Sequence, residues 1–410
     1  MFTKAQYHNK LKSLAEDNHL IGMSVIIVQK GKIKDIFHYG KSNIERNIQV
    51  NDNTLFRIAS ISKAITSVAL MKLYEIGKFN LDDDISPYLG YKVINPNFPE
   101  KKITFRMLLT HTSSLLDGDT YDDFLMASYK QNPPPNLKEL LTEGGSHYQT
   151  GIWKNTEPGR FFSYSNLNYG IIGTLIEKLS SQHFDVFVRK EILYPMGISG
   201  SFNVCDIENV NNISTLYRNS LAQVDDYKGI TPKVKVLSTY KIGDNGIIHS
   251  PAGGLRISAV DLGKFMIMLM NFGEYNGCRI LDSTTVQLMC GSQWKFNGFN
   301  GDNSNNLFNE WGLGFHIVTG TKNKDCIFNG ETMIGHTGDA YGLISCMFFN
   351  EQRDFGFVFI TNGYSGGKGY ANSGKNAFYK PESEAFEVIE EYWCKKYLGT
   401  TKKMKIIKQN

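Results

Sequence analysis

The sequence lacks the features that mark several common classes of protein. Its six cysteines are scattered, with no Cys-x-x-Cys pair and no adjacent histidine pair, so neither a zinc site nor a dense disulfide framework is expected. The 44 basic and 40 acidic residues nearly balance, which argues against a dedicated nucleic-acid-binding protein. No G-x-G-x-x-G or P-loop sequence occurs, so nothing indicates a nucleotide-binding fold.

Long hydrophobic runs are also missing. The start, residues 1–8, has no apolar core of signal-peptide length, and no window approaches a transmembrane span. As the sequence stands, we expect a cytoplasmic protein without a membrane span; a trimmed leader would instead make it extracytoplasmic. The cysteines are then expected to be reduced, structural thiols. The basic cluster of the tail, Lys402 to Lys408, is interpreted as a solvated terminus.

What is present is a pattern of strands at both ends with helices between them. Helices are predicted over residues 4–18, 60–77, 104–109, 171–179, 262–270 and 382–396. Strands are predicted over residues 22–29, 33–40, 311–319, 333–336, 343–350 and 355–361. This order predicts an α+β fold in which one antiparallel sheet is assembled from both termini. We expect a sheet-bearing region (1–80 and 300–410), a mainly helical region (81–299), and an active site at their junction.

One stretch combines a hydroxyl and an amine at the start of an apolar helix. Ser60 and Lys63 stand three residues apart, and apolar residues recur until Gly77, which is placed like a helix C-cap. Free backbone N–H groups and the helix dipole favour developing negative charge in such a first turn. If its neighbours desolvate Lys63, the neutral amine can take the serine proton. The pattern indicates a nucleophilic serine that needs no histidine.

The Ser-x-x-Lys motif is weak when taken alone. It also occurs at Ser238/Lys241, Ser292/Lys295 and Ser365/Lys368. An N-cap serine followed by a solvated lysine is the simpler interpretation of any single copy. What distinguishes Ser60 and Lys63 is their apolar helix and the partners found further along the chain.

The first partner is a Tyr-x-Asn motif formed by Tyr164 and Asn166. A tyrosine held near a lysine can ionise and act as a base, while a carboxamide can orient both the lysine and a substrate carbonyl. The same pattern occurs at Tyr7/Asn9, Tyr217/Asn219 and Tyr370/Asn372. A partly buried structural tyrosine is therefore the alternative interpretation.

The second partner is the run His336, Thr337, Gly338 and Asp339 at the end of a predicted strand. Small residues at a strand edge leave room for a substrate backbone to lie alongside. The backbone N–H of Asp339 can then join that of Ser60 as an oxyanion hole. Taken alone, His336 would more often be a surface or structural histidine.

In this order and separation, these stretches resemble the serine β-lactamase and penicillin-binding-protein superfamily. The closest likeness is to its class C branch, with D,D-carboxypeptidases, D-aminopeptidases and esterases. Residues 108–113, 251–255 and 311–315 add to the likeness, which runs from about Gly22 to the C-terminal helix. The resemblance implies a β-lactamase/transpeptidase-like fold forming one catalytic unit.

The resemblance also implies roles for the site residues. It makes Ser60 the acylated nucleophile, Lys63 and Tyr164 the proton-transfer pair, and Asn166 a positioning residue. The third motif, His336-Thr337-Gly338, would line the substrate strand. The implied reaction is attack on an ester or amide bond, an acyl-enzyme, and then hydrolysis or transfer. A small molecule or short peptide is the expected substrate, and no metal or organic cofactor is needed.

Two residues depart from the β-lactamase pattern. His336 stands where true β-lactamases have lysine, and a histidine with an ordinary pKa near ~6.5 is mostly neutral and recognises carboxylates less well. Asp339 adds a negative charge that would repel carboxylates if it faces the cleft. Both changes favour neutral esters or amine-bearing peptides over β-lactams. No acidic residue is obviously placed for class A-type deacylation, which agrees with a tyrosine-based branch.

Three other functions are compatible with parts of the sequence. Residues 363–367 match G-x-S-x-G, but an α/β-hydrolase needs a helix directly after the serine and a later histidine, and His336 is the last histidine in the chain. A non-catalytic binding or scaffold protein has no need of a lysine beside a serine. An acyltransferase would use the same acyl-enzyme. The sequence leaves substrate and oligomeric state open.

Overall fold

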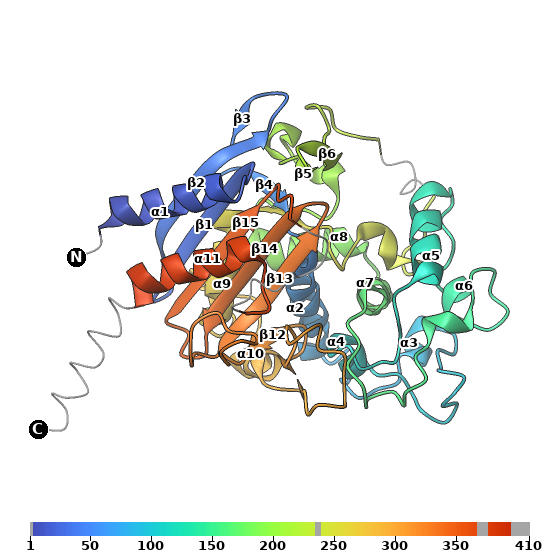
Figure 1. Cartoon of the computed structure of the whole chain (residues 1–410). Helices are drawn as coiled ribbons and strands as arrows, with labels where there is room; N and C mark the ends of the chain where they lie inside the picture. Colours follow the sequence, from blue (N-terminus) through green and yellow to red (C-terminus); the bar gives the residue numbers. More distant parts are fainter. Residues whose placement is uncertain (1–2, 234–238, 367–375, 395–410) are drawn as a thin grey trace, which may run out of the picture.

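The computed structural model describes residues 3–233, 239–366 and 376–394. Its centre is a nine-stranded antiparallel sheet with the order β10-β11-β12-β13-β14-β15-β1-β2-β3 (Figure 1). The strands are β1 (Gly22–Gln29), β2 (Lys32–Asn43), β3 (Ile48–Gln49), β10 (Trp294–Lys295), β11 (Glu310–Trp311), β12 (His316–Val318), β13 (Met333–Ala340), β14 (Leu343–Asn350) and β15 (Phe355–Thr361). β1 pairs with β15, so the predicted sheet built from both ends of the chain is confirmed.

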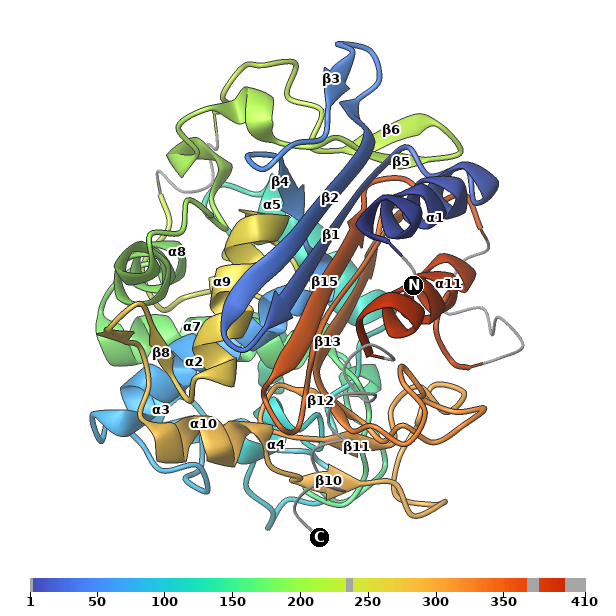
Figure 2. The same ribbon diagram turned by 90° about the vertical axis from the view of Figure 1, so that its left-hand side faces the viewer.

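Helices cover both faces of this sheet (Figure 2). One face packs on α1 (Lys4–Asp17) and α11 (Lys380–Ile389) through residues such as Ile27 and Phe357. The other face packs on α9 (Ala259–Met270) and α2 (Ser62–Glu75) through residues such as Ile26. Because both faces are buried, β1 is apolar along most of its length instead of alternating with polar residues.

The remaining elements lie beside the sheet. The helices are α3 (Ser86–Leu89), α4 (Phe105–Leu109), α5 (Asp119–Lys130), α6 (Lys138–Leu141), α7 (Asn166–Ser180), α8 (Phe184–Val188) and α10 (Ser283–Cys290). Short antiparallel pairs join β4 (Leu55–Arg57) to β7 (Arg256–Ser258), β5 (Leu216–Arg218) to β6 (Leu221–Val224), and β8 (Glu274–Tyr275) to β9 (Cys278–Arg279). Residues 81–299 thus hold most helices, yet they also supply α9, which packs on the sheet, and β10, which belongs to it.

Short helical turns link these elements. They are η1 (Ala59–Ile61), η2 (Thr150–Ile152), η3 (Arg189–Leu193), η4 (Tyr194–Met196), η5 (Val204–Asp206), η6 (Val210–Asn212), η8 (Gly246–His249) and η9 (Glu390–Cys394). None of the described helices is both long and apolar enough to cross a bilayer.

Local sequence signals account for several helix ends. Ser258 caps α9 by accepting the backbone N–H of Asp261 at 3.0 Å, as its position before an apolar helix predicts. Gly77 follows α2 with φ of +70°, a left-handed conformation that suits glycine. α7 begins at Asn166, five residues before the predicted start at 171.

Other predictions differ in detail. The expected strand over residues 311–319 is divided into β11 and β12, because Gly314 adopts φ of +82° between them. The C-terminal helix begins at Lys380 and becomes a π-type turn, η9, after Ile389. The basic tail from Lys402, and the loop after the G-x-S-x-G sequence from 367 to 374, lie outside the described residues. Five of the six cysteines, Cys205, Cys278, Cys290, Cys326 and Cys346, are free thiols.

Candidate active site

Ser60 lies in the turn η1, between β4 and the buried helix α2. The preceding residue, Ala59, has φ of +48°, a left-handed conformation that is uncommon for a residue with a Cβ. Gly338 of β13 packs against this turn so closely that an added Cβ would lie 2.5 Å from the carbonyl oxygen of Ile58. The nucleophile candidate is thus held on a constrained turn between the sheet and α2.

Lys63 is completely buried directly behind Ser60. Its Nζ lies 3.0 Å from the Ser60 Oγ, 2.8 Å from the Asn166 Oδ1 and 2.9 Å from the backbone oxygen of Ala252. The same Nζ stands 4.8 Å from the centre of the Tyr164 ring. The structure therefore brings together the four residues that the sequence motifs single out.

Burial lowers the pKa of Lys63 to about 7, and the Asp117 carboxylate acts in the opposite direction. A large fraction of the amine is therefore neutral near neutral pH. A neutral amine has two N–H bonds and one lone pair. When the oxygens of Asn166 and Ala252 accept these two N–H bonds, the lone pair is left for the Ser60 hydroxyl, whereas the protonated amine donates to all three oxygens.

Asp117 is a residue of this site that the sequence reasoning missed. Its carboxylate accepts the side-chain and backbone N–H groups of Asn166, each at 2.8 Å, the backbone N–H of Leu167 at 3.0 Å and the hydroxyl of Ser165 at 2.9 Å. It thus caps the N-terminus of α7, where a negative charge is favoured. The only local signal is an aspartate before Gly118 that closes a hydroxyl-rich turn.

Tyr164 lies near Ser60, and its ring lies between His111 and Phe308 with centroid distances of 4.4 and 5.2 Å. Burial raises the pKa of this tyrosine well above its ordinary value. The side chain is therefore a neutral phenol. This differs from the expectation that Tyr164 ionises, because the buried site disfavours the phenolate more than the nearby lysine favours it.

His336 lies in β13 but is only 1% exposed. Its Nδ1–H donates to the backbone oxygen of Thr337 at 2.6 Å, and its ring contacts Trp311 with centroids 5.4 Å apart. Burial lowers its pKa well below the ordinary value, so it stays neutral instead of titrating near 6.5. His336 is not among the described residues that line the cavities at Ser60, so its expected place along the substrate is not reproduced.

Thr337 and Asp339 do reach the cavities at Ser60. Beyond Gly335, no described strand pairs with the outer edge of β13, so this edge is open as the sequence reasoning expected. The Asp339 carboxylate accepts the hydroxyl of Tyr379 at 2.5 Å, and burial raises its pKa above the ordinary value. A carboxyl group therefore lies at the cavity wall, although burial makes it easier to protonate than an exposed aspartate.

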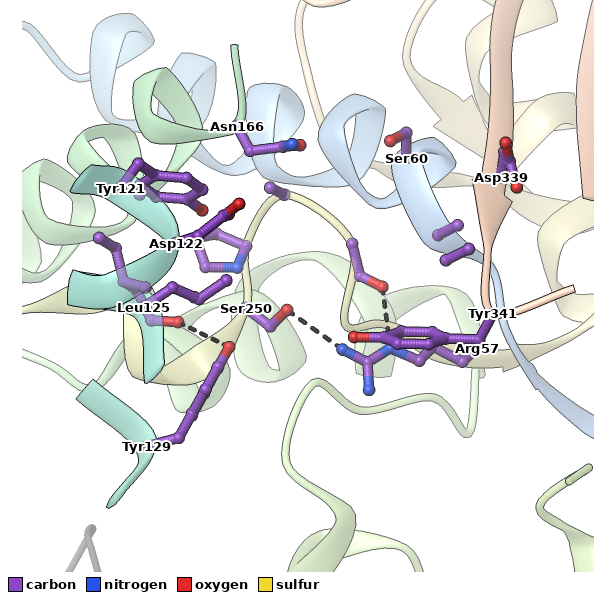
Figure 3. A pocket seen from close by; sticks show the side chains of 17 residues that line it. Arg57, Ser60, Tyr121, Asp122, Leu125, Tyr129, Asn166, Ser250, Asp339 and Tyr341 are labelled. Carbon is purple, nitrogen blue, oxygen red and sulfur yellow. Dashed lines mark hydrogen bonds between the residues drawn. The ribbon is translucent and has the colours of Figure 1, made fainter. Parts of the chain in front are cut away.

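Two cavities meet at Ser60. The first, of about 230 Å³, is lined on one side by Tyr121 and Asp122 of α5 and on the other by Arg57 and Tyr341 (Figure 3). Arg57 donates to the Ser250 Oγ at 3.4 Å and to the Gly253 carbonyl oxygen at 3.3 Å, and its guanidinium lies over the Tyr341 ring. The second cavity adjoins Tyr164 and is lined by Ser163, Asp302, Ser304 and Phe308. Sequence motifs do not reveal these walls because they come from distant segments.

The chain matches the family described as Beta-lactamase over residues 8–377. It belongs to the β-lactamase family. Protein flp of Staphylococcus aureus (strain N315) is 28% identical over 181 residues, which are 44% of this chain and 34% of that protein. The chain therefore matches only about a third of the length of this relative. Putative penicillin-binding protein PbpX of Bacillus subtilis (strain 168) is 23% identical over 337 residues, 82% of this chain and 72% of that protein.

Two solved structures share the fold of this chain. The D-amino acid amidase from Ochrobactrum anthropi SV3, complexed with L-phenylalanine, has a TM-score of 0.68 and 18% identity, covering 94% of this chain and 96% of that one. The octameric penicillin-binding protein homologue from Pyrococcus abyssi has a TM-score of 0.66 and 22% identity, covering 94% and 76%. The resemblance noted in the sequence and the β-lactamase/transpeptidase-like fold are confirmed.

Proposed function

We propose that this chain is a serine hydrolase that forms an acyl-enzyme on Ser60 and cleaves an ester or amide bond. One observation carries the proposal. The buried Nζ of Lys63 gives its two N–H bonds to Asn166 and Ala252 and turns its third position to the Ser60 Oγ at 3.0 Å. This is the geometry of a general base that activates a hydroxyl nucleophile.

In the proposed reaction, the Ser60 proton passes to the neutral Lys63 while Oγ attacks the substrate carbonyl carbon. The new C–O bond forms and the carbonyl electron pair moves to its oxygen. The backbone N–H groups of Ser60 and Asp339 donate hydrogen bonds to this negatively charged oxygen. The tetrahedral species then collapses and its bond to the leaving group breaks. The neutral phenol of Tyr164 gives its proton to the leaving group and regains one from Lys63.

The second half of the reaction frees Ser60. Water takes the place of the leaving group and loses a proton to the same Lys63 and Tyr164 pair as it attacks the acyl carbonyl. The ester bond to Oγ breaks, and Oγ regains its proton. Asn166 orients Lys63 and faces the substrate. Thr337 and Gly338 form the strand edge along which the substrate lies. An alcohol or amine in place of water would make the same chemistry an acyl transfer.

The charges around the cavity support a neutral or amine-bearing substrate over one with a carboxylate. His336 is neutral and does not line the cavity, whereas Asp339 and Asp122 place carboxyl groups at its wall. Arg57 is the cation among the described lining residues, and its guanidinium lies 4.0 Å from the buried Asp225. An amino-acid amide or a short-chain ester suits this arrangement better than a β-lactam does.

The test compares wild type, Ser60→Ala and Ser365→Ala after incubation with a nitrophenyl ester, phenylalanine amide or benzylpenicillin. Product release reports turnover, and the intact mass of the protein reports acylation. Ser365 is the serine of the rejected G-x-S-x-G sequence and serves as the matched control. We expect product release that Ser60→Ala abolishes and Ser365→Ala retains, with Tm nearly unchanged in both variants. Turnover that persists in Ser60→Ala would exclude this mechanism. If wild type neither turns over nor is acylated by any of the three, the chain is better described as a binding or scaffold protein.

A further inference from the structure

A second cluster of reactive side chains lies on the same helix as Asn166, but far from Ser60. Glu177 is eleven residues further along α7, about 16 Å at 1.5 Å per residue. His183 directly precedes α8, and His249 ends the turn η8. One ligand atom from each of these three residues lies within 4.8 Å of the others.

The two histidines carry buried ring nitrogens without hydrogen-bond partners. The Nε2 of His249 and the Nδ1 of His183 are both in this state, and the His249 side chain is only 2% exposed. The Nε2 of His249 lies 3.1 Å from the Glu177 Oε1, but the two atoms do not form a hydrogen bond. Buried ring nitrogens left unpaired are costly, so they call for a ligand.

The spacing of these atoms suits a shared cation. Two ligands at 2.0–2.1 Å from a tetrahedral zinc ion lie about 3.3 Å apart. The 3.1 Å between the His249 Nε2 and the Glu177 Oε1 is close to that value. His183 is only partly buried at the start of α8, so rotation of its side chain can bring its Nδ1 closer to the other two atoms.

The charge of the cluster points the same way. Glu177 is completely buried, and its carboxylate accepts the hydroxyl of Tyr240 and the backbone N–H groups of Gly243 and Phe184, at 2.9 and 3.0 Å for the last two. These donors are all neutral. They orient the carboxylate but add no positive charge of their own, which a bound cation would supply.

The surroundings also place a carboxylate near the other nitrogen of His249. Its Nδ1 lies 3.6 Å from a carboxylate oxygen of Asp185, slightly beyond hydrogen-bond distance. A carboxylate behind one ring nitrogen keeps the proton there and leaves the other nitrogen free to bind metal, as in many zinc sites. The donated hydroxyl of Tyr240 has the same orienting effect on Glu177.

We propose that Glu177, His183 and His249 form a binding site for one divalent transition-metal ion, with Zn²⁺ as the preferred ion. Two imidazoles and one carboxylate are a zinc-type ligand set, and the fourth position is open to water. The site is separate from the proposed hydrolysis at Ser60 and supplies no step of it.

Metal at this site would stiffen the wall of the active site. His249 is followed by the turn 250–254, in which the Pro251 oxygen accepts the Thr66 hydroxyl at 2.8 Å and the Ala252 oxygen accepts Lys63. Fixing His249 therefore fixes the segment that positions Lys63. The expected role is structural: the ion stabilises the folded chain by binding it in preference to the unfolded one.

The experiment measures Zn²⁺ binding by calorimetry and by metal analysis of the full chain after treatment with EDTA and gel filtration. We expect one equivalent of Zn²⁺ and a Tm about 2 °C higher at tenfold excess over Kd. His183→Gln and His249→Gln should each weaken binding at least tenfold, because losing a ligand should cost no less than losing one of the outer partners that orient ligands. The control is His19→Asn, an exposed histidine with φ of +51° that asparagine tolerates; it should bind as wild type does.

Because the described thiols can also bind zinc, binding by wild type alone does not identify the site, and the two histidine variants are needed. Loss of the bound Zn²⁺ in both His183→Gln and His249→Gln, with native circular dichroism, supports the site. Zinc that stays bound in both variants, or wild type that binds none, overturns it and leaves His249 and Glu177 as a buried ion pair. The part-exposed His183→Gln keeps the test decisive if His249→Gln fails to fold. None of these readouts depends on hydrolysis at Ser60.

Discussion

The carboxylate of Asp117 holds Asn166 by two hydrogen bonds, one to its backbone N–H and one to its side-chain N–H, each at 2.8 Å. Since the amide nitrogen is engaged there, the amide oxygen points the other way and accepts the Nζ of Lys63. An aspartate that never touches Ser60 thus sets the orientation of the group that holds the proposed base.

The first prediction concerns the pH dependence of the reaction. Lys63 acts as a base only when neutral, and burial lowers its pKa to about 7. The kcat/KM should therefore be low in acid and rise with pH through a limb near 7, as a pH series with a neutral ester would show. Lys63→Met should lower kcat/KM about 10³-fold and remove the limb.

The matched control for that variant is Lys72→Met on the same helix. Lys72 donates to the backbone oxygen of Ile280 at 2.7 Å, away from Ser60. Its loss should leave the pH profile unchanged. A wild-type profile that is flat between pH 5 and 9 would contradict the role of Lys63.

Asp117→Asn tests whether Asp117 acts on Asn166 and Lys63 or only caps the helix α7. The Asp117 carboxylate raises the pKa of Lys63, so its removal should lower that pKa further and move the limb of kcat/KM to lower pH. Weaker capping of α7 should also cost about 1 kcal/mol of stability, measured by urea unfolding. The exposed Asp119→Asn at the start of α5 should do neither. A stability loss with an unmoved limb would restrict Asp117 to capping.

Asp339→Asn tests the proposed preference for an amine-bearing substrate. Removing the carboxylate should lower kcat/KM for phenylalanine amide relative to a neutral nitrophenyl ester by about tenfold, the equivalent of about 1.4 kcal/mol. The control is Glu351→Gln, an exposed residue in the turn that follows β14. Equal losses of kcat/KM for both substrates would show that Asp339 does not recognise the charge of the substrate.

Gly338→Ala tests the contact between β13 and the turn that carries Ser60. The new Cβ would lie 2.5 Å from the Ile58 carbonyl oxygen and from the Ser345 Oγ, so the turn must shift. We expect a loss of about 1–3 kcal/mol in stability and at least a tenfold loss in kcat/KM. Gly151→Ala is the control, because its Cβ would have no atom closer than 4.0 Å. Wild-type kinetics in Gly338→Ala would contradict this contact.

Local patterns predict the elements of this fold well, because periodicity and caps depend on near neighbours. The strands β1, β14 and β15 begin and end where their apolar runs do, and Ser258 caps α9 as its position suggests. The limits appear where a distant segment intervenes. The division between β11 and β12 at Gly314, for example, depends on a turn whose Gly314 N–H bonds to Leu109 of the helical region.

The candidate site divides in the same way. The sequence alone names Ser60, Lys63, Tyr164 and Asn166, because their short motifs occur in the family order, and it determines that no histidine follows His336 in the chain. It could not show that Tyr164 and His336 are buried and neutral, since pKa depends on desolvation by residues far away in the chain.

Only the tertiary structure decided three further matters: that Asp117 holds Asn166, that α5 and Arg57 wall the cavity, and that Glu177, His183 and His249 converge. No spacing rule predicts these groupings, because each joins segments separated by tens of residues through packing of the helices against one another and the sheet. The sequence by itself determined which chemical groups are present and on which elements they lie. Packing decided which of them meet, how much water reaches them, and therefore which protons they hold.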